Sequence, residues 1–228
     1  KRSLRSHWAP GIAGAAGVED PLVAPSAVDE VDLGQQIDNL TDLVRSIPES
    51  EVKARRMIQL ADVYRERAAL HRAAAEEEKR RWWDEFQDDV SAKENRGVIG
   101  CPQFASDSLA DSDLKKALAI YLHVLKKYPS HSRTERAQEY SLRCYLDLEE
   151  RDKATAVLAK LEASDPSGQA LARSYIAVAN HELEGKRPAD ALAHYEKAAA
   201  IAEPELKREA ERRAAECREQ IGRGSAPR

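Results

Sequence analysis

The chain has 228 residues, of which 33% are charged and 5% aromatic, and its formal net charge is -4. Much Ala, Glu, Arg and Leu with few aromatic residues is typical of helical proteins, so we expect an all-α fold with almost no strand. The 36 basic and 40 acidic residues are mixed along the chain, which argues against a nucleic-acid partner because such a partner needs a basic face. No apolar run reaches the roughly 18 residues that predict a transmembrane helix.

The sequence carries no pattern of a catalytic, cofactor or metal site. Cys101, Cys144 and Cys217 are widely spaced and form no CxxC pair, so neither a zinc site nor a disulfide framework is indicated. No glycine-rich phosphate loop, GxSxG or HExxH motif occurs, and the six histidines are scattered. We therefore expect no enzyme and no cofactor. Cys144 and Cys217 should be buried, and Cys101 is the one candidate for a reactive thiol.

The first part of the chain divides into an arm and a helix. Residues 1–30 hold three prolines and three glycines without a helical period, which predicts a flexible N-terminal arm. From Val31 the apolar residues follow 3-4 spacing, as in Leu33, Ile37 and Leu40, until Pro48. This pattern predicts an amphipathic helix of about 15 residues.

A very long helix and a loop are expected next. Residues 49–94 contain no Pro or Gly, so we expect one helix there and a loop at 95–112, which together complete an N-terminal region over 31–112. The adjacent Trp82 and Trp83 cannot share a helix face. We expect Trp82 to continue an apolar stripe with Phe86, covered by the loop, and Trp83 to stay exposed as a protein contact.

Residues 113–204 repeat with a spacing of 37. Each predicted second helix carries a small residue, a bulky one four positions later and a small or apolar one three further on. These sets are Ala117, Tyr121 and Val124; Ala154, Leu158 and Leu161; and Ala191, Tyr195 and Ala198. The intervening helices match at 35, as Ala137 with Ala172, and we assign the two-residue difference to the turn containing Gly185 and Pro188.

These units resemble tetratricopeptide repeats (TPR), in which a small Ala early in the second helix, an aromatic residue four positions on and a terminal Pro recur. Here Pro129 and Pro166 follow the first two units. The resemblance implies a TPR-like helical-hairpin solenoid. Residues 205–222 suit the capping helix that such an array needs, and 223–228 form a tail.

The resemblance also implies where a partner binds. Helical-repeat arrays bind ligands on the concave surface lined by their first helices. The candidate protein-binding residues on these helices are Arg136, Arg143, Arg173 and Asn180, beside Glu139 and Glu184 and in addition to Trp82 and Trp83. Three arginines suit an acidic or C-terminal peptide, and a solvated face without a ligand is the alternative.

A weaker resemblance concerns the order of the segments LVRSIPES, RMIQLADVYRERA and YPSHSRTERAQEYSLRCYL. It is similar to TPR proteins of delta-proteobacterial cell-envelope or motility complexes, which favours the periplasm or envelope over the cytoplasm. We expect a protein-protein interaction adaptor or scaffold. The alternative is a self-associating structural component of an envelope assembly.

Overall fold

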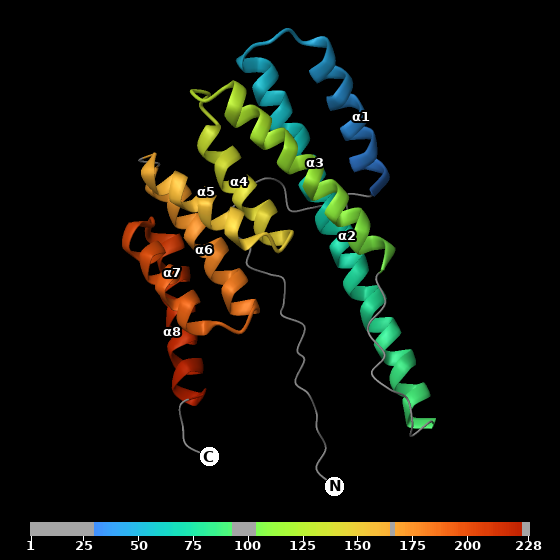
Figure 1. Cartoon of the computed structure of the whole chain (residues 1–228), viewed down its shortest axis with the longest axis vertical. Coiled ribbons are helices and arrows are strands. Elements are labelled where there is room, and N and C mark those ends of the chain that lie inside the picture. The colour runs from blue at the N-terminus through green and yellow to red at the C-terminus, as the bar shows by residue number, and fades with distance from the viewer. Residues whose placement is uncertain (1–29, 93–103, 165–166, 225–228) are drawn as a thin grey trace.

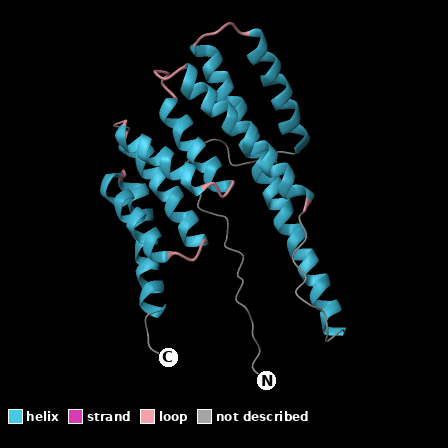
Figure 2. Cartoon of the chain, viewed as in Figure 1, coloured by secondary structure: helices cyan, strands magenta, loops and turns pink. Residues whose placement is uncertain are grey.

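The computed structural model describes residues 30–92, 104–164 and 167–224, and these residues contain eight α-helices and no strand (Figure 1; Figure 2). The helices are α1 (Glu30–Ser46), α2 (Glu51–Ala92), α3 (Ala105–Lys127), α4 (Thr134–Asp147), α5 (Arg151–Ala163), α6 (Gly168–Glu184), α7 (Pro188–Ile201) and α8 (Pro204–Gly224). The all-α expectation is confirmed. The predicted arm over residues 1–29 and Cys101 lie outside the described residues.

Consecutive helices pack as antiparallel hairpins. Helix α2 packs against both α1 and α3, α4 against α5, and α6 against α7, with α8 on the far side of α7. Helix α4 also contacts α3 and α6, so it joins the N-terminal helices to the C-terminal ones. Helix α2 has 42 residues, and its C-terminal part extends beyond the start of α3 (Figure 1). None of the described helices is both long and apolar enough to cross a membrane.

The residues that repeat at a spacing of 37 are buried at the helix contacts. Ala117, Ala154 and Ala191 are at most 1% exposed. Because a small side chain lets two backbones approach, the helices of a hairpin meet closely at these positions. Tyr121 and Tyr195 fill the space one turn further on, and both are fully buried.

The hydroxyl group of each of these two tyrosines also forms a hydrogen bond with the facing helix of its hairpin. The Tyr121 hydroxyl donates to Oδ1 of Asp62 on α2, and the Tyr195 hydroxyl donates to Oδ1 of Asn180 on α6, both at 2.5 Å. A buried hydroxyl without a partner would be costly. In each of the two hairpins, a hydrogen bond therefore joins the two helices in addition to their apolar contact.

The turns α4–α5 and α6–α7 share one backbone geometry. Glu149 and Lys186, 37 positions apart, both have a positive φ, 59° and 57°. In each turn the following amide reaches back to the preceding helix. These bonds are Glu150 N to Tyr145 O at 2.8 Å and Arg187 N to Glu182 O at 2.9 Å. This is the Schellman pattern, which satisfies the last carbonyl groups of a helix.

The equal turns correct one prediction. The two-residue length difference was expected in the turn containing Gly185 and Pro188, but α4–α5 and α6–α7 are connected by stretches of equal length, 148–150 and 185–187. The difference lies within the helices, because α4 ends at Asp147, 10 residues after Ala137, and α6 ends at Glu184, 12 residues after Ala172. The spacing of 37 therefore relates both second helices and both turns.

The predicted loop over 95–112 is wrong for its second half, because α3 begins at Ala105. Contacts with α2 support this early start. Ser106 Oγ donates to Glu78 at 2.9 Å, Lys79 pairs with Asp107 at 3.2 Å, and Ala110 is fully buried. The polar stretch ASDS looks like a loop in isolation, yet it becomes helical because its partners lie on a neighbouring helix.

Candidate interaction groove

A groove of about 260 Å³ is lined by residues of α2, α4, α6 and α8. Three of these, α2, α4 and α6, are the first helices of the three hairpins. The lining residues with ionisable side chains are Arg65, Arg143, Asp147, Arg173, His181, Glu184 and Glu209. Leu146, Ile176, Ala177 and Leu206 form the apolar part of the lining. The groove is therefore amphipathic and carries both signs of charge.

Glu139 holds two of the predicted site residues together. Its carboxylate accepts a hydrogen bond from Arg143 Nη2 and another from Arg173 Nε, both at 3.0 Å. The sequence placed Glu139 on an open face, but the residue is only 2% exposed. One buried carboxylate thus fixes an arginine of α4 beside an arginine of α6.

Asn180 completes the group of predicted residues in this groove. Its Oδ1 accepts the hydroxyl of Tyr195, so part of its hydrogen-bonding capacity is used inside the α6–α7 hairpin. The structure brings Arg143, Arg173 and Asn180 to one groove, as the sequence predicted for the first helices.

Arg136 lies in a neighbouring groove of about 670 Å³ between α1, α2 and α4. Its Nη2 pairs with Asp62 Oδ2 at 3.1 Å. Arg56 and Arg133 line the same groove, together with Gln36, Asn39 and Gln59. The predicted site residues of α4 are therefore distributed over two adjacent grooves.

Trp82 and Trp83 lie apart from both grooves. They occupy the part of α2 that extends beyond α3, and their rings pack edge to face with centroids 5.1 Å apart. Trp83 is 46% exposed, as expected for the ring that cannot share the face of Trp82. The side chain of Phe86 and residues 95–103 of the predicted covering loop lie outside the described residues. Leu109, from the remaining part of that loop, lies in α3 and is 50% exposed.

Sequence reasoning missed Arg65 as a groove residue. Arg65 stands between Ala61 and Ala68, which are almost fully buried on the inner face of α2. Its guanidinium carbon lies 4.1 Å from the centroid of the Tyr140 ring on α4. The available signal was a charged residue at an i, i+4, i+7 position of an apolar stripe.

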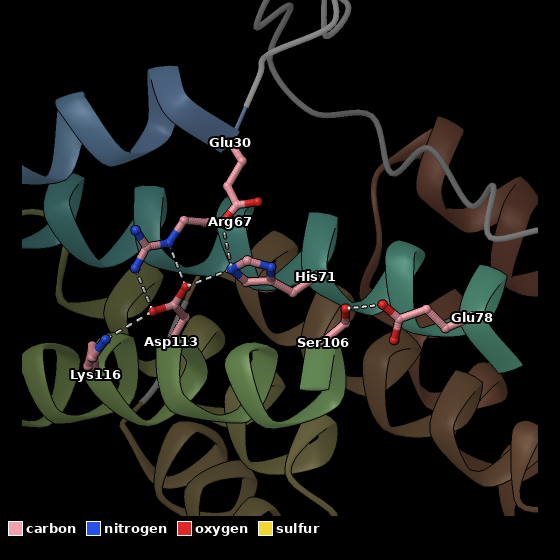
Figure 3. A network of polar contacts seen from close by, with 7 residues as sticks. All are labelled: Glu30, Arg67, His71, Glu78, Ser106, Asp113 and Lys116. Carbon is pink, nitrogen blue, oxygen red and sulfur yellow. Dashed lines mark hydrogen bonds and ion pairs between the residues drawn. The ribbon is translucent and has the colours of Figure 1, made fainter. Parts of the chain in front are cut away.

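A separate polar cluster joins α1, α2 and α3 (Figure 3). Arg67 donates through Nε and Nη2 to the two oxygens of Asp113, at 2.6 and 2.8 Å, and Lys116 lies 3.2 Å from the same carboxylate. His71 Nε2 lies 3.7 Å from Asp113 and 3.8 Å from Glu30. Burial acts to raise the pKa of Asp113, but the hydrogen bonds and charges of Arg67 and Lys116 outweigh it and lower this pKa. The cluster acts as a clamp between helices.

The two described cysteines are buried and free. Burial raises the pKa of the Cys144 thiol to about 12 and also raises the pKa of Cys217. Both thiols are therefore protonated near neutral pH and behave as small apolar side chains, as predicted. Within the described parts of the chain, no group of three or more His, Cys, Asp or Glu residues could hold a metal ion.

No protein-family model, curated protein or solved structure matches this chain. The arrangement of the groove itself indicates what it can bind. The apolar part of its lining can pack against apolar groups of a ligand, and its arginines can donate hydrogen bonds to carboxylate or carbonyl oxygens.

Proposed function

We propose that the protein is a non-catalytic adaptor or scaffold that binds a segment of another protein in the groove between α2, α4, α6 and α8. One observation carries the proposal: the groove is lined by the first helix of each hairpin and by α8. Successive first helices that line one surface give a continuous site for an extended or helical peptide.

The internal repeat supports a TPR-like solenoid as the architecture of this adaptor. The Ala and Tyr positions repeat at a spacing of 37, and the turns at Glu149 and Lys186 repeat with them. Helix α8 buries Leu206, Ala210 and Ala214 against the last hairpin. It therefore serves as the polar-faced cap that such an array requires.

A matched pair of arginine substitutions tests the proposal. Peptides are first selected on the wild-type protein from a displayed random library, and their dissociation constants are measured by fluorescence anisotropy. Ala177→Arg fills the groove, whereas Ala159→Arg adds the same side chain on the exposed face of α5. We expect Ala177→Arg to weaken binding at least tenfold and Ala159→Arg to leave it unchanged.

Two outcomes would contradict groove binding. One is a library that yields no peptide with a measurable dissociation constant. The other is a set of peptides that bind Ala177→Arg as tightly as the wild type. Circular dichroism and urea unfolding of both variants show whether a loss of binding reflects a loss of fold.

Exposed Trp83 favours a second candidate function, self-association through the extended part of α2 within a larger envelope assembly. An exposed Trp beside charged residues is typical of an interface anchor. Light scattering during gel filtration would show a dimer or larger species that Trp83→Ala converts to a monomer. A wild-type protein that stays monomeric over the accessible concentration range would exclude this candidate.

A further inference from the structure

Three arginines surround one aromatic ring at the junction of the two grooves. The guanidinium carbons of Arg65, Arg136 and Arg143 lie 4.1, 5.0 and 5.8 Å from the centroid of the Tyr140 ring. We call these four residues the Tyr140 cluster. A tyrosine ring attracts cations at its face. The Tyr140 ring therefore stabilises three positive charges that lie near one another, that of Arg65 on α2 and those of Arg136 and Arg143 on α4.

The arginines of this cluster differ in their counter-ions. Arg136 pairs with Asp62 and Arg143 with Glu139. Arg65 forms no hydrogen bond or ion pair with any other described residue, whereas the buried Nε without a hydrogen-bond partner is common to all three arginines. Arg65 is half-buried, and a partly desolvated guanidinium without an ion pair favours an anion supplied from outside.

Among the described residues, Arg65 is the arginine of the cluster that forms no ion pair of its own. Glu139 is shared, because it also accepts from Arg173. Asp62 and Glu139 thus form their ion pairs with Arg136, Arg143 and Arg173, and neither forms an ion pair with Arg65. A further carboxylate, that of Asp147, interacts electrostatically with Arg65 and Arg143 and is exposed in the same groove.

We propose that the groove binds a carboxylate group of its peptide ligand at Arg65 and Arg143, with Tyr140 holding both guanidinium groups in position. Both arginines line the groove. A guanidinium presents its N–H groups as a planar fork that matches the two oxygens of a carboxylate. This inference rests on the proposed function and adds the chemistry of the ligand to it.

Acetate, which is the carboxylate group without a peptide, tests the site independently of any selected peptide. The wild-type protein is titrated with sodium acetate, and with sodium chloride at equal ionic strength, while the arginine Nε–H signals are followed by NMR. We expect a saturable shift of the Arg65 signal with acetate and no saturable shift with chloride. Equal, non-saturating shifts with both salts would overturn the proposal.

Two substitutions identify the site, one that removes a positive charge and one that removes a negative charge. Arg65→Gln should abolish the saturable response. Asp147→Asn removes the competing carboxylate and should tighten acetate binding about threefold, the size expected for one exposed charge. The second variant changes a side chain on the surface, so it keeps the test valid where Arg65→Gln fails to fold. Acetate binding that neither Arg65→Gln nor Asp147→Asn alters would place the anion elsewhere and refute the assignment.

The selected peptides distinguish the two possible sources of the carboxylate, which are the C-terminus of the peptide and an Asp or Glu side chain. Each peptide is compared with its C-terminally amidated form and with a form in which Asn and Gln replace its Asp and Glu. We expect one of the two changes to weaken binding to the wild type at least tenfold and to leave the residual binding to Arg65→Gln unaltered. Peptides that bind in the groove and tolerate both changes would retain the proposed function and reject the carboxylate site.

Discussion

At the scale of single residues, Glu139 decides how the two arginines of the groove are placed. Its buried carboxylate joins Arg143 of α4 to Arg173 of α6. Both arginines are about one-third exposed at their side chains. Loss of the carboxylate would therefore leave two partly desolvated guanidinium groups without the acceptor that both of them bind.

We predict that Glu139→Ala destabilises the protein by about 1–3 kcal/mol, less than a fully buried pair would lose because water screens the arginines. Urea unfolding followed by circular dichroism measures the change. Glu184→Ala, an exposed substitution in the same groove, should change stability by less than about 0.5 kcal/mol. Equal effects of the two substitutions would show that the bridge between α4 and α6 contributes nothing specific.

The residues whose burial was predicted correctly are those whose position follows from the period of a single helix. Ala117, Tyr121 and their repeats are buried because spacing alone places them on the inner face. Glu139 and Arg65 were not predicted, because their burial depends on charged or aromatic partners on a different helix. Periodicity contains no information about such pairings.

At the scale of secondary-structure elements, the contact between α2 and α3 combines an apolar core with the Arg67–Asp113 clamp. Asp113 is 2% exposed and accepts from both Arg67 and Lys116. The pKa of Asp113 is lowered in the folded protein. Its contribution to stability is therefore fully present above its unfolded-state pKa, near 4, and is lost as pH falls through the lower folded-state pKa.

We predict that Asp113→Asn lowers the unfolding free energy by about 2–4 kcal/mol at pH 7, because it removes the negative partner of a mostly buried ion pair. The difference from the wild type should narrow as the pH falls from 5 to 3, since the carboxylate of the unfolded wild type then takes up a proton, whereas that of the folded protein resists protonation. Urea unfolding of both proteins across this range measures the gap. A difference in unfolding free energy that stays constant down to pH 3 would contradict a contact between α2 and α3 that depends on the charge of Asp113.

The repeated turns make a second prediction at this scale. Lys186 adopts a left-handed conformation with φ of 57°, which costs a residue with a Cβ atom about 1–2 kcal/mol. Lys186→Gly should relieve this strain and stabilise the protein by about 0.5–1 kcal/mol after the entropic cost of glycine. Lys186→Ala also removes the charged side chain but keeps the Cβ atom, so it should bring no gain in thermal unfolding. Equal effects of Gly and Ala would show that the turn is not strained.

The boundaries of the helices show where sequence reasoning is limited. The end of α1 before Pro48 was predicted within a few residues because a proline marks it. The start of α3 at Ala105 was missed because residues 105–112 carry no such signal and owe their helix to partners on α2. Contacts that cross from one helix to another decided this boundary.

At the scale of the whole molecule, the buried residues form clusters that follow the order of the helices. One cluster joins α2, α3 and α4, and another joins α4 through α8. Helix α4 contributes to both. Because the hairpins of the described residues pack mainly against their neighbours, a local defect at one end should leave the other end folded.

We predict that Ala210→Glu, which forces a charge into the contact of α8 with α7, unfolds the C-terminal end alone. Ala210 is fully buried, whereas Ala215 on the same helix is exposed, so Ala215→Glu is the matched control. Hydrogen exchange with mass spectrometry should show faster exchange in peptides from α7 and α8 of Ala210→Glu and unchanged exchange in α2 and α3. The control should match the wild type throughout. Faster exchange in all helices of Ala210→Glu would mean that the molecule unfolds as one cooperative unit, and the picture of stacked, nearest-neighbour hairpins would then be wrong.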